Sequence, residues 1–242
     1  MKTLAIVQAR MGSSRLPGKV LIDLAGETVL ARVVRRSARA VLVDQIVVAT
    51  SSSSMDDAVV SECVRLGVEY FRGSQSDVLD RYYRCAQAFC ARAVVRITAD
   101  CPVIDPALVD LTIRAFRQDP CDYASNAILP GYPRGLDVEV FTMSALSRAW
   151  HEARKPYERE HVTPYFYEHS ELFRLVSVNA ERDHSDLRWT LDTVEDLELL
   201  RAIYARLGPR DNFCWEDVLR IVQRESHLAS INSHVVQKAV HG

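Results

Sequence analysis

Three cations stand in a short Gly- and Ser-rich stretch near the N-terminus and could hold an anion. The stretch covers residues 9–19, directly after an apolar run over residues 4–7 that is too short for a helix and fits a buried parallel strand. Small residues let the backbone turn its N–H groups toward a ligand, and the cations add charge. The cations are Arg10, Arg15 and Lys19, and the small residues are Gly12, Ser13, Ser14 and Gly18. A polyphosphate is the anion that this combination favours.

The spacing within this stretch does not match the P-loop of an ordinary nucleoside triphosphatase. The gap between Gly12 and Gly18-Lys19 is one residue longer than that motif allows, and Val20 stands where the motif has a Mg²⁺-binding Ser or Thr. A turn whose cations face water would have the same composition. Residue types alone therefore leave both interpretations open.

Two aspartates lie at expected element boundaries, where a carboxylate can bind a metal ion. Asp100 follows an apolar run over residues 93–97 and precedes Pro102, which stiffens the turn, whereas Asp192 stands just before an expected helix. Mg²⁺ prefers one or two protein carboxylates, with phosphate oxygens and water completing its shell. Two aspartates far apart in the chain could converge on one cleft. A turn or capping role would explain each residue type equally well.

These segments resemble motifs of the CMP-sugar-acid synthetases, the cytidylyltransferases that activate acylneuraminate and 3-deoxy-manno-octulosonate. The similarity is closer to the SpsF-like subgroup, and it extends over most of the chain to about residue 205. One departure is Ala99, where the family usually has glycine. The matching segments are Ala9-Arg10, Ser14-Arg15-Leu16-Pro17-Gly18-Lys19, Asp100-Cys101-Pro102 and Leu191-Asp192-Thr193-Val194-Glu195-Asp196.

The resemblance implies that CMP passes from CTP to an acidic sugar, such as a nonulosonate or an octulosonate, and that pyrophosphate is released during surface polysaccharide biosynthesis. It implies catalytic roles for Arg10, Lys19 and Asp100. It also implies that Mg²⁺ is the cofactor, held by Asp100 and Asp192. The residues implied to bind the nucleotide are Ala9, Arg10, Gly12, Ser13, Ser14, Arg15, Lys19 and Arg72.

A second group of residues is implied to bind the acceptor, namely Asp137, Glu139 and His161. They lie within residues 120–180, which we expect to form an acceptor and dimerisation region inserted in a single domain over residues 1–242. The resemblance thus implies a homodimer. A structural hydrogen-bonding role on a helix would also explain His161.

Two other function classes stay open at this point. A glycosyltransferase that uses a nucleotide-sugar donor commonly has an Asp-x-Asp motif, and the nearest approach here is Asp137-Val138-Glu139. A catalytically idle nucleotide-binding module is the third possibility, and Ala99 is its only support. Thermal-shift measurements would distinguish these classes. Stabilisation by CTP and Mg²⁺ together with pyrophosphate release would indicate a cytidylyltransferase, whereas stabilisation by a UDP-sugar would indicate a glycosyltransferase.

The order of the expected elements predicts an α/β fold with a doubly wound, mostly parallel sheet, as in Rossmann-like nucleotidyltransferases of the GT-A-like type. In such folds ligands bind beyond the carboxyl ends of the strands, where residues 9–19 also lie. We expect strands at residues 4–7, 45–50, 68–71, 93–97, 122–125, 135–141 and 173–178. We expect helices at residues 28–40, 56–66, 77–91, 106–118, 143–153, from 157, 193–207 and 215–222.

Several charged residues have expected positions in these elements. The arginines at 32, 35, 36 and 39 are predicted to form a solvated face of the first helix. For Arg81, the sequence leaves two interpretations open, a role in the site and a position that faces solvent. The loop over residues 126–135 is predicted to be irregular and functional because it holds two Pro and two Gly. Residues 225–242 are expected to form a peripheral tail.

Composition limits the classes of partner. The chain of 242 residues has 30 Lys and Arg against 32 Asp and Glu, so it lacks the basic excess of a general nucleic-acid binder. No apolar run approaches the roughly 20 residues of a membrane span, and no signal-peptide pattern opens the chain, so we expect a cytoplasmic protein without membrane contact. The six cysteines lack a C-x-x-C pair and are expected to be reduced and mostly buried.

Overall fold

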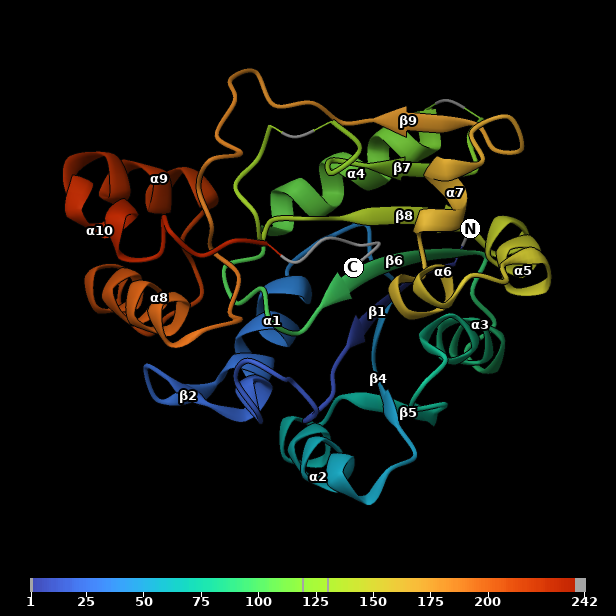
Figure 1. Cartoon of the computed structure of the whole chain (residues 1–242), viewed down its shortest axis with the longest axis horizontal. Coiled ribbons are helices and arrows are strands. Elements are labelled where there is room, and N and C mark those ends of the chain that lie inside the picture. Colours follow the sequence, from blue (N-terminus) through green and yellow to red (C-terminus); the bar gives the residue numbers. More distant parts are fainter. Residues whose placement is uncertain (1, 119, 130, 238–242) are drawn as a thin grey trace.

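A central mixed sheet organises the computed structural model, which describes residues 2–118, 120–129 and 131–237 (Figure 1). Its strands are β1 (Thr3–Gln8), β4 (Gln45–Ser51), β5 (Glu69–Gly73), β6 (Ala93–Thr98), β7 (Tyr123–Ser125), β8 (Glu139–Thr142) and β9 (Leu175–Ser177). Their order across the sheet is β5-β4-β1-β6-β8-β7-β9. Only β8 runs against its neighbours β6 and β7, and every other neighbouring pair described in this sheet is parallel. The predicted mostly parallel sheet is confirmed.

The helices begin and end close to the expected positions. Thr28 caps α1 by accepting from the Ala31 N–H, and Asp77 caps α3 in the same way from the Asp80 N–H. Gly67 ends α2 in the left-handed conformation, with φ 64°. The helices are α1 (Val29–Ser37), α2 (Asp57–Leu66), α3 (Val78–Ala88), α4 (Pro106–Gln118), α5 (Met143–Glu152), α6 (Pro156–His161), α7 (Pro164–Glu168), α8 (Val194–Leu207), α9 (Trp215–Arg224) and α10 (Ser226–Ile231). Two short elements, β2 (Asp23–Leu24) and β3 (Glu27–Thr28), pair as a separate hairpin.

Helices cover both faces of the sheet, as a doubly wound fold requires. Successive residues of a strand face opposite sides. In β1, Ala5 and Val7 pack against apolar side chains of α1, α2 and α4, whereas Leu4 and Ile6 pack against α3, α5 and α7. The apolar run that predicted a buried parallel strand therefore supplies both halves of the core.

A third apolar cluster lies under the helices that follow the sheet. Trp189 and Leu136, both buried, pack there against apolar side chains of α8, α9 and α10. Figure 1 shows these three helices gathered beyond the end of the sheet to which the β6 arrow points. The cluster thus lies next to the carboxyl edge of the parallel strands, where ligands bind in folds of this kind. None of the helices in the described residues has the length and apolar character needed to cross a membrane.

The strand expected over residues 135–141 forms only in its second half, because β8 begins at Glu139. Gly135 takes a φ of 105°, and a Cβ atom there would lie 2.7 Å from the backbone of Trp189 and Thr190. Arg134 forms an isolated parallel bridge with Arg188. The chain therefore leaves the strand geometry here to approach the segment before α8.

Most cysteines are buried, as expected, and all six are free thiols. Cys101 packs in the interior, and burial raises the pKa of its thiol well above the ordinary value. Cys90 is the exposed thiol among the described residues. It has a φ of 53°, a conformation that cannot continue a helix, and α3 accordingly ends earlier than residue 91.

The prediction that the arginines of α1 face solvent is wrong for Arg32 and Arg36. Arg36 is fully buried and donates to the carbonyls of Ile104 at 2.7 Å and Phe213 at 3.1 Å. Its guanidinium carbon also lies 4.0 Å from the centre of the Phe213 ring. Burial lowers the pKa of Arg36. The helix pattern could not reveal this, since the covering segment lies far along the chain.

We expect Arg36→Met to lower the free energy of unfolding by about 2–4 kcal/mol, because it leaves buried carbonyls without their donor. Arg35→Met is the matched control. Arg35 lies one position earlier on α1, its side chain is 46% exposed, and its pair with Glu27 is worth about 0–1 kcal/mol. Urea unfolding followed by circular dichroism measures both. Equal small losses would show that the buried guanidinium adds little to stability.

Candidate active site

The N-terminal loop closes on itself between β1 and a short 3₁₀ helix at Lys19–Leu21. The N–H groups of Ser13 and Gly18 both donate to the Met11 carbonyl, at 3.0 and 2.9 Å. Gly18 adopts the left-handed conformation with φ 70° at the start of the 3₁₀ helix. Asp56, at the start of α2, accepts from the Met11 N–H at 2.7 Å. This closure turns the chain so that Lys19 points back toward the sheet edge.

Lys19 lies between two carboxylates from distant parts of the chain. Its ammonium donates to Asp100 at 2.6 Å and to Asp192 at 2.7 Å, and the residue is only 9% exposed. Burial by itself would lower the pKa of Lys19. The two carboxylates outweigh that effect and hold the pKa above its ordinary value. The loop that was predicted to hold phosphate therefore meets both predicted metal-binding aspartates through one cation.

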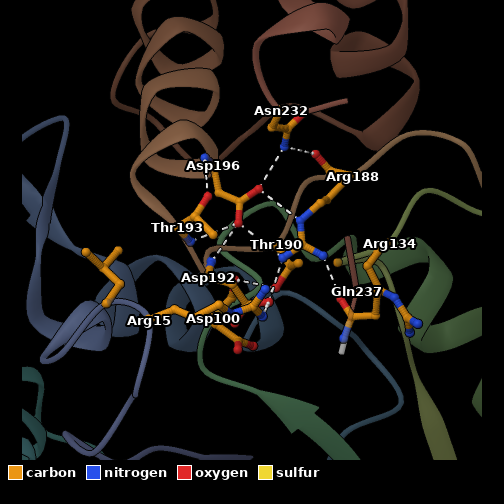
Figure 2. A network of polar contacts seen from close by, with 12 residues as sticks. Arg15, Asp100, Arg134, Arg188, Thr190, Asp192, Thr193, Asp196, Asn232 and Gln237 are labelled. Atoms are coloured by element: carbon orange, nitrogen blue, oxygen red, sulfur yellow. Dashed lines mark hydrogen bonds and ion pairs between the residues drawn. The ribbon is translucent and has the colours of Figure 1, made fainter. Parts of the chain in front are cut away.

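Asp192 contacts two further cations through its other oxygen. Arg188 donates to Oδ2 at 2.6 Å, and Arg15 lies 2.8 Å from the same atom (Figure 2). Burial alone would raise the pKa of Asp192, but Lys19, Arg188 and Arg15 hold it below its ordinary value. Asp192 is therefore a carboxylate at every pH near neutrality.

Backbone contacts explain why the two aspartates meet. Asp100 lies just beyond Thr98, the last residue of β6, and the segment before α8 runs alongside it, so that the Leu191 N–H donates to the Asp100 carbonyl at 2.8 Å. The Thr190 hydroxyl donates to the same carbonyl at 3.2 Å. Thr193 and Asp196 form the expected capping box of α8. The structure thus brings Asp100 and Asp192 together at the carboxyl edge of the sheet.

The donor set fits a magnesium ion that binds together with a phosphorylated substrate. Asp100 and Asp192 offer hard carboxylate oxygens close enough to share one cation, as their contacts with Lys19 show. Within the described ranges, no three His, Cys, Asp or Glu side chains gather as a metal-binding group. Two carboxylates plus substrate oxygens and water is the mode of binding that Mg²⁺ favours.

The other predicted nucleotide-binding cations lie around this cluster. Arg10 is exposed and lies 3.6 Å from Glu160, so only a weak surface pair restrains it. Arg72 lies 2.7 Å from Asp57 and donates to the carbonyls of Ser51, the last residue of β4, and Ser53, in the loop that follows. Gly12 has open space where a side chain would stand. Arg10 and Gly12 therefore lie on the accessible side of the N-terminal loop, while Arg72 stabilises the loop after β4.

The solvent-exposed alternative for Arg81 is wrong. The side chain is fully buried in α3 and donates through Nη1 to the Ser74 carbonyl at 2.6 Å. Its Nε and Nη2 atoms have no hydrogen-bond partner among the described residues, and neither does Oε1 of Gln8, at the end of β1. Arg81 is therefore part of the interior beside the loop between β5 and α3.

The predicted acceptor-binding residues lie in different parts of the fold. Glu139 is buried in the sheet, where it accepts from the Tyr123 hydroxyl at 2.6 Å and pairs with Arg96. Asp137 lies 3.4 Å from Arg134, and His161 is the last residue of α6. Asp137 thus contacts the preceding loop and Glu139 contacts the sheet, and the acceptor roles of all three residues stay predictions. Residue 130, which also belongs to the predicted acceptor region, lies outside the described residues.

Sequence reasoning missed Arg188 as a member of the cluster. The residue stands four positions before Asp192 in an otherwise mostly apolar segment, which was the available signal. It also missed Asn232 and Gln237, whose side chains reach Arg188 from the segment expected to be a peripheral tail. Residues 238–242 of that tail lie outside the described residues.

Comparisons with known proteins agree with this geometry. Residues 4–220 match the family model described as Cytidylyltransferase. The chain is 34% identical to the spore coat polysaccharide biosynthesis protein SpsF of Bacillus subtilis, over 94% of this chain and 96% of that protein. It is 28% identical to a 3-deoxy-manno-octulosonate cytidylyltransferase of Mesorhizobium japonicum, over 85% and 87%. A solved cytidylyltransferase from Leptospira borgpetersenii has a TM-score of 0.92 at 32% identity, covering 99% of this chain and all of that one.

We expect Lys19→Ala to lower the free energy of unfolding by about 1–2 kcal/mol at pH 7, because two close carboxylates lose their shared donor. Above the ordinary pKa of Asp192, 3.8, the contribution of its lowered pKa is fully present, and it is lost as the pH falls through the lowered value. The raised pKa of Lys19 keeps the ammonium charged over this range. The loss should therefore shrink between pH 5 and pH 3, which urea unfolding at both values would measure.

Lys2→Ala is the control for this pH dependence. Lys2 is exposed and donates to the Phe89 carbonyl rather than to a carboxylate, so its effect on stability should be small and equal at both pH values. A Lys19→Ala effect that stays the same from pH 5 to pH 3 would contradict the role given to Asp192.

Proposed function

This chain belongs to the cytidylyltransferase family and is a CTP-dependent nucleotidyltransferase, and from this premise we propose that it transfers CMP from CTP to an acidic sugar, a nonulosonate or an octulosonate. The acceptor class is supported by the relatives, one of which is named for 3-deoxy-manno-octulosonate. A role in surface polysaccharide biosynthesis agrees with the name of SpsF.

One observation carries the proposal: the Lys19 ammonium is shared by Asp100 and Asp192 at the carboxyl edge of the sheet. A reaction of a triphosphate that binds with a metal ion needs cations to hold the phosphates and carboxylates to hold the metal. In the free protein the ammonium pairs with both carboxylates. An incoming phosphate competes for the ammonium, and its metal ion competes for the carboxylates.

The cations of the N-terminal loop hold the triphosphate. Lys19 and Arg15 turn from the carboxylates to phosphate oxygens, and Arg10 joins them, since its surface pair with Glu160 is weak. Ala9, Gly12, Ser13 and Ser14 let the loop backbone approach the phosphates closely. Arg72 holds the loop after β4 beside the nucleotide.

Asp100 and Asp192 would hold Mg²⁺, which when bound supplies positive charge at the α-phosphate. The acceptor hydroxyl attacks the α-phosphorus, the bond from that phosphorus to the bridging oxygen of the β-phosphate breaks, and pyrophosphate leaves. The hydroxyl proton passes to solvent. The protein contributes mainly position and charge stabilisation, and Lys19 acts on the charge that develops on the phosphates.

The glycosyltransferase alternative finds no support in the contacts of its motif. It relied on Asp137 and Glu139, and the Glu139 carboxylate is turned to Tyr123 and Arg96 in the sheet. Acceptor binding by Asp137, Glu139 and His161, a homodimer and a cytoplasmic location stay predictions.

We expect pyrophosphate release from CTP when the protein is given Mg²⁺ and an acidic sugar. A coupled pyrophosphate assay with four nucleoside triphosphates against a panel of nonulosonates, octulosonates and neutral hexoses tests both base and acceptor. Release with CTP and one acidic sugar is the expected result. Release only with neutral sugars, or stabilisation only by a UDP-sugar in thermal-shift measurements, would overturn the proposed acceptor class.

We expect Lys19→Ala to slow pyrophosphate release about 10²–10³-fold, because it removes a cation that stabilises the charge developing on the phosphates. Circular dichroism should show an unchanged secondary structure. Lys2→Ala, on the exposed surface, should keep the wild-type rate. A Lys19→Ala variant with unchanged turnover would remove the central element of the proposal.

A further inference from the structure

Arg188 is a buried arginine whose guanidinium nitrogens all have partners. It is 8% exposed. Nη2 donates to Asp192 at 2.6 Å, Nε donates to Asp196 at 2.9 Å, and Nη1 donates to Gln237 at 2.6 Å. Figure 2 shows Arg188 lying among these three side chains. One planar group thus connects a site carboxylate to a buried carboxylate of α8 and to the C-terminal segment.

Asp196 does more than cap α8. Its Oδ2 accepts from the backbone N–H groups of Asp192 and Thr193, at 2.8 and 3.0 Å. Its Oδ1 accepts from Arg188 and also from Nδ2 of Asn232, at 2.8 Å. A capping box needs only the contacts between Thr193 and Asp196. The contacts with Arg188 and Asn232 therefore serve something other than the start of the helix.

Asn232 brings the C-terminal segment into this network. It is 3% exposed and also donates to the Arg188 carbonyl at 2.9 Å. The residue follows α10, whose Leu228 is buried in the cluster beneath α8 and α9. Beyond it, the Val236 carbonyl accepts from Arg15 at 3.4 Å. Figure 1 shows the red C-terminal segment running from these helices toward the middle of the sheet.

The three cations that contact Asp192 differ in their other contacts. Lys19 contacts the two site carboxylates, and Arg15 contacts Asp192 and a backbone carbonyl, so both are able to turn to a phosphate. Arg188 has its own buried carboxylate in Asp196, and turning away would leave that charge unpaired. Arg188 is thus the cation that stays on Asp192 when substrate arrives.

We propose that Arg188 and Asn232 are positioning residues, which keep the Asp192 carboxylate in place for Mg²⁺ after Lys19 and Arg15 have moved to the triphosphate. The proposal rests on the proposed function, because it assumes a metal ion that enters with CTP. Asp196 neutralises Arg188, so the charge of Asp192 remains available to the metal. Asn232 fixes both members of that pair, which makes the C-terminal segment a part of the metal site.

The test is the gain in CTP affinity that Mg²⁺ brings, measured by titration calorimetry with Mg²⁺ and with EDTA. In Asn232→Ala and Arg188→Lys we expect this gain to fall about tenfold, the loss typical of residues that orient a metal ligand. The affinity for CTP in EDTA should stay within about twofold of wild type, since the phosphate-binding loop is unchanged. The Mg²⁺ concentration for half-maximal pyrophosphate release should rise by a similar factor.

Leu228→Ala is the matched control, because it loosens α10 against α8 without removing a polar contact of the network. Its melting temperature should fall while the Mg²⁺-dependent gain stays at the wild-type value. Equal losses of the gain in Leu228→Ala and Asn232→Ala, or an unchanged gain in Asn232→Ala, would overturn the proposal. If Asn232→Ala does not fold, Gln237→Ala at the exposed end of the network decides: a smaller gain supports the proposal, and an unchanged gain contradicts it.

The two proposals fail in different ways. A wild-type protein that releases no pyrophosphate with any acidic sugar, while Asn232→Ala loses the Mg²⁺-dependent gain in CTP affinity, would refute the acceptor class and support the positioning role. A wild-type protein that is active on an acidic sugar, together with variants whose Mg²⁺-dependent gain in CTP affinity is unchanged, would support the acceptor class and refute the positioning role.

Discussion

The contact of one ammonium with two carboxylates requires three distant parts of the molecule to meet at one place. Lys19 can reach Asp100 and Asp192 only if the N-terminal loop closes, β6 ends at the same edge of the sheet as β1, and the segment before α8 lies beside Asp100. Each of these conditions has its own backbone hydrogen bonds. The contact is also temporary in the proposed reaction, so the scaffold must hold the carboxylates when the ammonium leaves.

Buried arginines provide that scaffold at several points. Arg36 joins α1 to the loop after Asp100 and to the start of the α9 region through backbone carbonyls, and Arg188 joins Asp192 to α8. A planar group with several donors can satisfy acceptors from segments that no regular element connects. The segments around Asp100 and Asp192 lie mostly outside regular strands and helices, and hydrogen bonds from arginine side chains thus hold them in place.

The sequence predicted most of the sheet and the centre of the site because both follow local rules. Short apolar runs identified the strands, parallel strands end at one edge, and Asp100 follows such an end, while Asp192 stands just before a helix. The burial of Arg36 and Arg81 could not be predicted, since their surroundings come from distant segments. The partial loss of the strand before Glu139 depends on the close approach of Gly135 to Trp189, and Asn232 becomes a neighbour of Asp196 only through helix packing.

The position of Cys90 makes the protein suited to attachment far from the carboxylate pair. This exposed thiol precedes the first residue of β6, whereas Asp100 follows the last, so roughly 20 Å of strand separates them. Cys101, beside Asp100, is buried and has a raised pKa, which keeps it poorly reactive. A maleimide fluorophore or a surface linker at Cys90 would therefore be attached at the edge of the sheet opposite Asp100.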